Sequence, residues 1–302
     1  METICKICPR QCGINRNSKT GFCKASNTVA VSKVMLHYFE EPLISGEDTP
    51  SKKANGSGTV FFANCTLKCV YCQNSEISAG GMGKEISINK LADIFKTLEN
   101  AGANNINLVT PTHYTLQIIE ALNIYRPKIP IVWNTSGYET PETIKLLDGY
   151  VDIFLTDFKY VSSEISAKYS LAPNYFENCS KSTLEMRKIV PNDIIEDGLM
   201  KKGIIVRHLV LPGQTADSLK VIDWISKNLG NKTYFSLMSQ YVPMADAKKH
   251  PEINRKINKL EYKILVKKLE DLGFENAFVQ EFASAETCFT PDFFEQDDKF
   301  TF

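Results

Sequence analysis

The sequence predicts an α/β fold: a partial (β/α)6 barrel that follows a small cysteine-rich metal-binding module at the N-terminus. Two features lead to this prediction. Strand-like and helix-like segments alternate from residue 59 to residue 273 in about six repeats, which is typical of a parallel sheet covered by helices. In addition, seven of the nine cysteines lie among the first 72 of the 302 residues, which indicates metal chemistry at that end.

The individual elements follow from hydrophobic periodicity and from end signals. In the first predicted helix, Ser87 can cap the N-terminus, apolar side chains from Leu91 to Leu98 form one face, and Gly102 ends the helix. Because chemistry gathers at the carboxyl ends of parallel strands, polar residues at those ends are the candidates for function. The predicted strands cover residues 59–64, 104–110, 129–136, 151–160, 203–213 and 232–241, and the predicted helices cover residues 87–102, 114–125, 140–150, 162–188, 217–230 and 259–273.

The composition excludes several functional classes. Lys and Arg total 35, as do Asp and Glu, so the net charge of zero offers no basic excess for nucleic acid. No apolar run approaches the ~20 residues of a membrane span, and the N-terminus lacks the apolar stretch of a secretion signal. We therefore expect a cytoplasmic protein whose cysteines serve as metal ligands or catalytic groups rather than as disulfides.

Three regions are expected along the chain. Residues 1–46 form the cysteine-rich module and connector, residues 47–280 form the barrel, and residues 281–302 form an aromatic tail that either folds over the barrel or docks a partner. The stretch 47–58 is polar and rich in Gly, Ser and Lys, as connectors are.

Three cysteines, Cys65, Cys69 and Cys72, follow the first barrel strand with the spacing C-x-x-x-C-x-x-C. Thiolates are the ligands that iron–sulfur clusters prefer. Three of them on a [4Fe-4S] cluster leave one iron without a protein ligand, and an open coordination position is where a metal performs chemistry. The alternatives are a zinc site completed by a distant His, and three core cysteines without a metal.

This arrangement resembles the radical S-adenosylmethionine (radical SAM) superfamily. The resemblance implies a [4Fe-4S] cluster on the three cysteines, with SAM chelated by the open iron and cleaved reductively to a 5′-deoxyadenosyl radical. Tyr71 matches the aromatic position that packs near adenine in that superfamily.

Further residues are similar to those of glycyl-radical-enzyme activases. "CVYCQN" resembles their cysteine motif, "DFK" (Asp157, Lys159) resembles their D-x-K, and "RHLVLPG" resembles their R-x-x-x-x-P-G, whose arginine, here Arg207, lies near SAM. The whole chain resembles the pyruvate formate-lyase-activating-enzyme-like group. This resemblance implies the glycine of a glycyl radical enzyme as substrate and flavodoxin or ferredoxin as electron donor. The alternatives are modification of another protein, a peptide or a small molecule.

The chain also departs from the superfamily. The G-G-E that holds the SAM amino group is replaced by "VTPTHY", in which Thr110 and Thr112 offer hydroxyls but no carboxylate is present. The ferredoxin-like insert of some activases is missing. Asn134 and Ser136 are candidates for the SAM ribose, although a polar turn at a strand end is as often structural.

Alternation along a strand places Asp157 and Lys159 on one face. A surface ion pair is the structural alternative, and an inward-facing pair favours function. Arg207 at a strand end suits a bidentate carboxylate clamp, whereas its neighbour His208 should point the other way and pack. His113 and Gln240 are weaker candidates.

The N-terminal cysteines Cys5, Cys8, Cys12 and Cys23 can close a four-thiolate site for zinc, or hold a second iron–sulfur cluster. Cys179 and Cys288 are most simply buried, small apolar residues. Two other classes stay open: an iron–sulfur redox protein without SAM chemistry, and a zinc-dependent nucleic-acid-binding protein that uses basic residues near the N-terminal cysteines. The balanced net charge disfavours the second.

Overall fold

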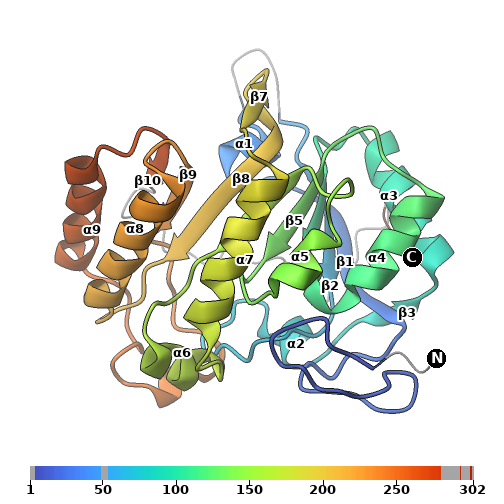
Figure 1. Cartoon of the computed structure of the whole chain (residues 1–302), viewed down its shortest axis with the longest axis horizontal. Coiled ribbons are helices and arrows are strands. Elements are labelled where there is room, and N and C mark those ends of the chain that lie inside the picture. The colour runs from blue at the N-terminus through green and yellow to red at the C-terminus, as the bar shows by residue number, and fades with distance from the viewer. Residues whose placement is uncertain (1–3, 49–53, 280–292, 294–299, 301–302) are drawn as a thin grey trace.

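The computed structural model describes residues 4–48, 54–279, 293 and 300. Strands and helices alternate along the described chain, as predicted (Figure 1). The strands are β1 (Val29–His37), β2 (Ser57–Phe62), β3 (Lys84–Ile86), β4 (Ile106–Val109), β5 (Ile131–Thr135), β6 (Ile153–Asp157), β7 (Ile194–Glu196), β8 (Leu199–Leu209), β9 (Tyr234–Met238) and β10 (Ala277–Val279). The α-helices are α1 (Pro42–Ser45), α2 (Ser75–Ser78), α3 (Ile88–Asn100), α4 (Thr115–Ile124), α5 (Pro141–Lys145), α6 (Ser163–Ser170), α7 (Tyr175–Ile189), α8 (Thr215–Leu229) and α9 (Lys259–Leu272), and short 3₁₀ turns cover Thr112–Tyr114 and Ala245–Lys249.

One sheet organises the molecule, with the strand order β10-β9-β8-β6-β5-β4-β2-β1-β3. The strands from β2 to β10 in this order are parallel, and helices α3, α4, α5, α7, α8 and α9 cover the outer face (Figure 1). The predicted α/β fold with a parallel sheet is confirmed, and all six predicted strands are present. The sheet has one further parallel strand, β10, that the sequence pattern did not reveal.

The N-terminal edge of the sheet is antiparallel. β1 pairs with β2, and β3 pairs with the opposite side of β1. Residues 29–45, which fall in the predicted N-terminal module, thus include a sheet strand and helix α1. The three proposed region boundaries stay predictions.

Local signals explain most helix ends. The Ser87 side chain accepts a hydrogen bond from the backbone N–H of Lys90 and caps α3, as expected. Asn258 and Glu261 form a capping box at the start of α9. The helical region predicted over residues 162–188 is present as two helices, because Leu171 adopts φ 52° and ends α6 before α7 begins. A left-handed residue cannot continue a right-handed helix.

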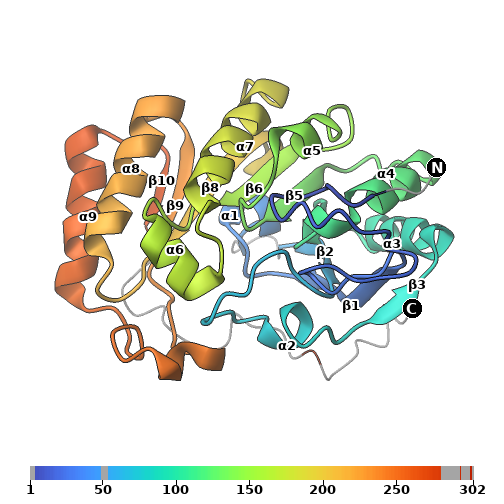
Figure 2. The ribbon, with the colours of Figure 1, turned by 60° about the horizontal axis from the view of Figure 1, so that its bottom comes forward.

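The two ends of the barrel differ. Ile44 of α1 packs against inward-facing side chains such as Leu155 and Ile205 and closes one end. Helices α2 and α6 lie at the other end, where the strands finish (Figures 1 and 2). The loop after β2 also lies there, so the candidate residues at strand ends share one open mouth.

The C-terminal tail contributes two described side chains. Phe293 packs edge-on against Phe61 of β2, with ring centroids 5.5 Å apart, and Phe300 is buried in the main core. Cys288 lies outside the described residues. No helix in the described ranges is both long and apolar enough to cross a bilayer.

Candidate active site

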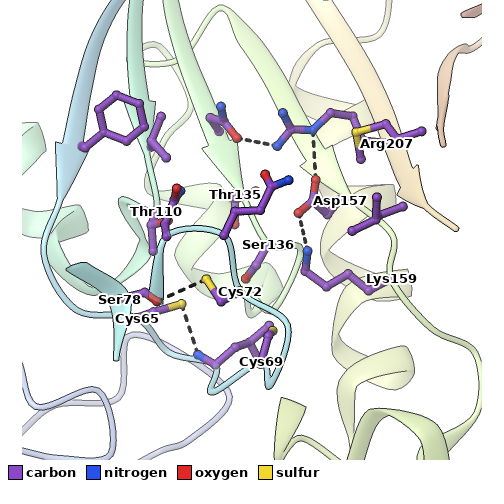
Figure 3. A pocket seen from close by; sticks show the side chains of 18 of the residues that line it. Cys65, Cys69, Cys72, Ser78, Thr110, Thr135, Ser136, Asp157, Lys159 and Arg207 are labelled. Carbon is purple, nitrogen blue, oxygen red and sulfur yellow. Dashed lines mark hydrogen bonds and ion pairs between the residues drawn. The ribbon is translucent and has the colours of Figure 1, made fainter. Parts of the chain in front are cut away.

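A cavity of about 220 Å³ lies inside the barrel and opens at the carboxyl ends of the strands (Figure 3). Residues from β2, the following loop, β4, β5, β6, β8 and β9 contribute to it. Ten of the predicted site residues line this single cavity: Cys65, Cys69, Tyr71, Cys72, Thr110, Asn134, Ser136, Asp157, Lys159 and Arg207.

The loop that carries the three cysteines is held by distant backbone. The N–H groups of Lys68 and Val70 donate to the carbonyls of Ser170 and Tyr169 at the end of α6, over 3.4 and 2.9 Å. Asn64, in the left-handed region with φ 74°, turns the chain out of β2 into this loop. The turn at Asn64 and the contacts with the end of α6 together determine the path of the loop.

Each of the three sulfur atoms has its own hydrogen-bond partner. The Leu67 N–H donates to Cys65 Sγ over 3.4 Å. Ser170 Oγ lies 2.9 Å from Cys69 Sγ. Ser78 Oγ lies 3.2 Å from Cys72 Sγ (Figure 3). Hydrogen bonds to ligating sulfur stabilise the thiolate form and tune an iron–sulfur centre.

The donor set fits the expected [4Fe-4S] cluster. Burial raises the pKa of Cys65 to about 12 and that of Cys69 to about 11, the latter opposed by Lys159. Such thiols keep their protons until a metal replaces them. In the described part of the chain no three Cys, His, Asp or Glu side chains are already arranged to hold a metal ion, so cluster binding would draw these thiols together.

A row of charged side chains lines the wall opposite the cysteines. Lys159 Nζ lies 2.5 Å from Asp157 Oδ2, and Arg207 Nε donates to Asp157 Oδ1 over 2.9 Å (Figure 3). Arg207 Nη1 donates to Glu40 over 3.1 Å, and Nη2 donates to Asn134 over 2.6 Å. The predicted inward pair is therefore present, and Arg207 is held by three partners within the barrel.

The pKa values in this row are set by mutual compensation. Burial alone would raise the pKa of Asp157, but Lys159 and Arg207 outweigh it and lower that pKa. Burial would lower the pKa of Arg207, and the neighbouring carboxylates reverse the direction. The Glu41 carboxyl, buried beside Glu40, has its pKa raised to about 6 by burial, against the lowering effect of Arg207. The row is thus a network of charges that depend on one another.

The other candidates divide between the cavity and its walls. Thr110 faces the cavity in the left-handed region, with φ 59°, an uncommon conformation for a β-branched residue. Tyr71 also faces it, with its hydroxyl bonded to that of Tyr160. Thr112 is not among the lining residues, because its hydroxyl donates to Glu139 over 2.7 Å behind the wall. Among the residues predicted to bind SAM, Thr112 is thus the one that the structure does not bring to the cavity.

The two histidine candidates have structural contacts. His113 Nε2 bonds the Ala63 carbonyl over 2.8 Å. His208 is buried between the Phe158 carbonyl and the Ser218 hydroxyl, consistent with the predicted outward packing role. Gln240 lines the cavity. Cys179 is fully buried, as expected of a small core residue.

Sequence reasoning missed Glu40 and Glu139. Glu40 lines the cavity and accepts hydrogen bonds from Asn107 and Asn134, besides Arg207. The sequence signal for Glu40 was the acidic pair Glu40 and Glu41 before Pro42. That pair does not indicate a site residue until β1 is known to belong to the sheet. Glu40 and Asp157 are the carboxylates among the lining residues, and neither comes from the loop where the superfamily has its glutamate.

Glu139 is a fully buried carboxyl behind the cavity wall. Its Oε1 accepts hydrogen bonds from Thr112, Trp133 and Thr135, whereas Oε2 has no hydrogen-bond partner among the described residues. Burial raises its pKa to about 7, although the three donors oppose the rise. A proton on Oε2 removes the buried charge.

Because the folded chain holds this proton on Glu139 more tightly than the unfolded chain does, the free energy of unfolding should fall as the pH rises. Because the folded pKa of about 7 lies above the ordinary 4.5, the folded chain binds the extra proton between these values. The contribution of this proton to the free energy of unfolding is fully present below about pH 4. It is lost as the pH rises through 7, and the loss amounts to about 3 kcal/mol. Urea denaturation of the wild type and Glu139→Gln between pH 5 and 8.5 should show this decline only in the wild type. Parallel pH curves would contradict the assignment.

Comparisons with known proteins point to one superfamily. The sequence model of the radical SAM superfamily matches residues 59–225. A curated relative from Methanocaldococcus jannaschii, uncharacterized protein MJ0674, is 34% identical over 276 residues, which cover 88% of this chain and 73% of the relative. Streptococcus suis SuiB, solved bound to the precursor peptide SuiA, superposes with a TM-score of 0.50 at 12% identity. That match covers 72% of this chain and 46% of the SuiB chain, and it supports the fold alone.

Proposed function

Because the chain belongs to the radical SAM superfamily, we propose that it is an enzyme that cleaves SAM at a [4Fe-4S] cluster held by Cys65, Cys69 and Cys72. Membership of the superfamily implies the cluster and SAM. The observation that carries the residue assignment is that the three thiols enter one cavity, each with a hydrogen-bond partner on its sulfur.

When bound, the cluster and SAM supply an electron and a 5′-deoxyadenosyl radical that removes a hydrogen atom from the substrate. The residues of the chain bind and orient SAM and shield the reacting carbon from water. Tyr71 offers a ring for adenine, and Thr110, Asn134 and Ser136 offer polar atoms to the rest of SAM. Apolar side chains between them exclude water from the reacting carbon: Phe61, Val109, Leu209 and Met238.

Asp157, Lys159 and Arg207 act as a preorganised unit. Their contacts fix each side chain before any ligand enters, so little reorganisation accompanies binding. Lys159 also lies close enough to Cys69 to offset part of the negative charge of a thiolate there.

The proposed substrate is the glycine of a glycyl radical enzyme, with flavodoxin or ferredoxin as electron donor. Support comes from the D-x-K and R-x-x-x-x-P-G residues, since Asp157, Lys159 and Arg207 all line the cavity. The alternative is hydrogen abstraction from another protein, a peptide or a small molecule. A glycyl radical signal in electron paramagnetic resonance, after incubation with a purified glycyl radical enzyme, distinguishes the two.

The proposal is tested by anaerobic reconstitution with iron and sulfide, reduction with dithionite, and chromatography for 5′-deoxyadenosine after SAM is added. We expect the wild type to form 5′-deoxyadenosine and Cys72→Ala to form none. Cys179→Ala is the matched control, because it removes a buried thiol outside the cavity and should keep the activity.

If the wild type forms no deoxyadenosine and SAM leaves the reduced cluster's magnetic resonance signal unchanged, the proposed function is wrong. The protein would then carry electrons without SAM chemistry.

A further inference from the structure

The N-terminal segment is folded tightly around four cysteines although it contains almost no regular structure. An isolated bridge joins Ile4 to Asn15, and Cys5 is held on both sides by hydrogen bonds with Ile14 and Gly13, of 2.8 and 3.0 Å. A segment with no helix and so few paired strand residues needs another source of stability.

Two tight turns present cysteines. The Gln11 N–H donates to the Cys8 carbonyl over 3.0 Å and closes the turn that Cys8 begins. The Lys24 N–H donates to the Gly21 carbonyl over 3.0 Å and closes a second turn, which carries Cys23. Short turns of this kind direct side chains to one point, as metal-binding loops do.

The surroundings of Cys12 are shaped to its sulfur. The Phe22 N–H points at Cys12 Sγ from 3.4 Å. A Cβ atom on Gly21 would lie only 2.7 Å from the same sulfur, so no larger residue fits there without displacing it. A backbone N–H directed at sulfur stabilises a thiolate ligand.

Contacts within the segment bring the four cysteines together. The Gly13 N–H, one residue after Cys12, donates to the Cys5 carbonyl, and the Phe22 N–H, one residue before Cys23, points at Cys12 Sγ. Cys8 and Cys23 are buried, with 6% and 8% of their surface exposed. All eight described cysteines are free thiols, so no disulfide explains this grouping.

Cationic side chains surround the group. Arg16 lies close enough to Cys23 to lower its pKa, and its buried Nε has no hydrogen-bond partner among the described residues. Lys68, in the loop of the three cavity cysteines, interacts electrostatically with both Cys23 and Cys65. These cations suit the negative charge that four thiolates place on a divalent ion.

Arg10 connects this group to the cavity loop. Its Nε donates to the carbonyl of Thr66, the residue after Cys65, over 3.0 Å, and its Nη1 donates to the Leu171 carbonyl over 2.6 Å. The guanidinium stacks on Phe22, 3.6 Å from the ring centroid. Figure 2 shows the N-terminal segment, dark blue, at the end of the sheet where α2 lies.

We propose that Cys5, Cys8, Cys12 and Cys23 bind one zinc ion as four thiolates, and that this zinc module holds Arg10 against the loop of the cavity cysteines. Binding releases the thiol protons to solvent and requires the side chains to rotate toward the ion. Four thiolates that include the close pair Cys5 and Cys8 are the donor set of structural zinc sites, and the metal and sulfide analysis distinguishes one zinc ion from a second cluster.

The first experiment counts metal in a Cys65→Ala/Cys69→Ala/Cys72→Ala variant, in which only the N-terminal group can bind. We expect one zinc per chain and no acid-labile sulfide by mass spectrometry and sulfide assay. Adding Cys12→Ala should remove the zinc, whereas adding Cys179→Ala should not. Absence of zinc, retention of zinc without Cys12, or iron with sulfide in its place would each overturn the site.

The second experiment tests Arg10 by hydrogen–deuterium exchange of the amides at residues 66–72 in the anaerobically purified, zinc-loaded chain with all of its cysteines present, because the loop sulfurs themselves accept or form hydrogen bonds there. Arg10→Ala should speed their exchange by about tenfold, since a charged hydrogen bond to the loop is lost. Arg126→Ala, which removes a surface arginine, should leave the rate unchanged. Equal rates for Arg10→Ala and its parent would overturn the link to the loop. Neither experiment needs SAM turnover, so failure of the proposed function would leave both readouts intact.

Discussion

Replacing Arg207 with leucine is expected to lower the free energy of unfolding by about 3–5 kcal/mol, because it leaves buried carboxylates without their cation. Arg207 contacts Asp157 and Glu40 through hydrogen bonds of 2.9 and 3.1 Å, and Glu41 lies 3.9 Å away. Asp157 keeps Lys159, but the two glutamates have no comparable substitute among their described contacts. Urea denaturation at pH 7 measures the loss.

The matched control is Arg126→Leu. Arg126 forms a 3.1 Å ion pair with Asp152, but the two side chains are 39% and 31% exposed. An exposed pair of this kind contributes at most about 1 kcal/mol. If Arg207→Leu costs no more than Arg126→Leu, the charged row does not stabilise the barrel.

Replacing Gly137 with alanine is expected to cost roughly 3 kcal/mol or more, from backbone strain and overpacking together. Its φ of +77° disfavours any side chain, and an added Cβ would lie 2.2 Å from the Asp157 carbonyl and 2.8 Å from Cys179 Sγ. The Asp157 carbonyl belongs to the end of β6, so the clash also displaces the Asp157–Lys159 pair. The free energy of unfolding, measured by urea denaturation, should fall, and so should the rate at which 5′-deoxyadenosine forms.

Gly149 separates the two causes. It has the same φ of +77°, but nothing lies within 4 Å of an added Cβ. Gly149→Ala should therefore cost only the strain, roughly 1 kcal/mol. Equal losses of unfolding free energy in the two variants would show that the contact with Asp157 relaxes freely.

The barrel could be predicted from sequence because its signals are local. Apolar periodicity, the Ser87 cap and Gly102 determine α3 within three residues, and the buried strands appear as short apolar runs. The positions of Asp157 and Arg207 at strand ends then placed them in one cavity, since parallel strands finish at the same edge.

The remainder depends on contacts between distant residues. Glu40 enters the cavity only because β1 pairs antiparallel with β2, and no short-range pattern encodes that pairing. The Thr112 side chain points away from the cavity because its hydroxyl donates a hydrogen bond to Glu139, 27 residues later in the sequence. Single-sequence reasoning has no access to such pairings. The break at Leu171 is different, because Pro173, two residues later, disfavours the helical conformation in the residue before it and is a local signal for the end of α6.

The residues that hold the cysteine loop are synthesised well after the loop itself. Cys69 is bonded to Ser170, which is 101 residues later in the sequence, and Val70 is held by Tyr169. At about 5–20 residues per second on the ribosome, roughly 5–20 s pass between the synthesis of the loop and the synthesis of its supports. During that interval the three thiols are part of an unfinished chain, exposed to oxidants and to stray metals. We therefore expect these thiols to be oxidised most readily before the α6 segment has emerged.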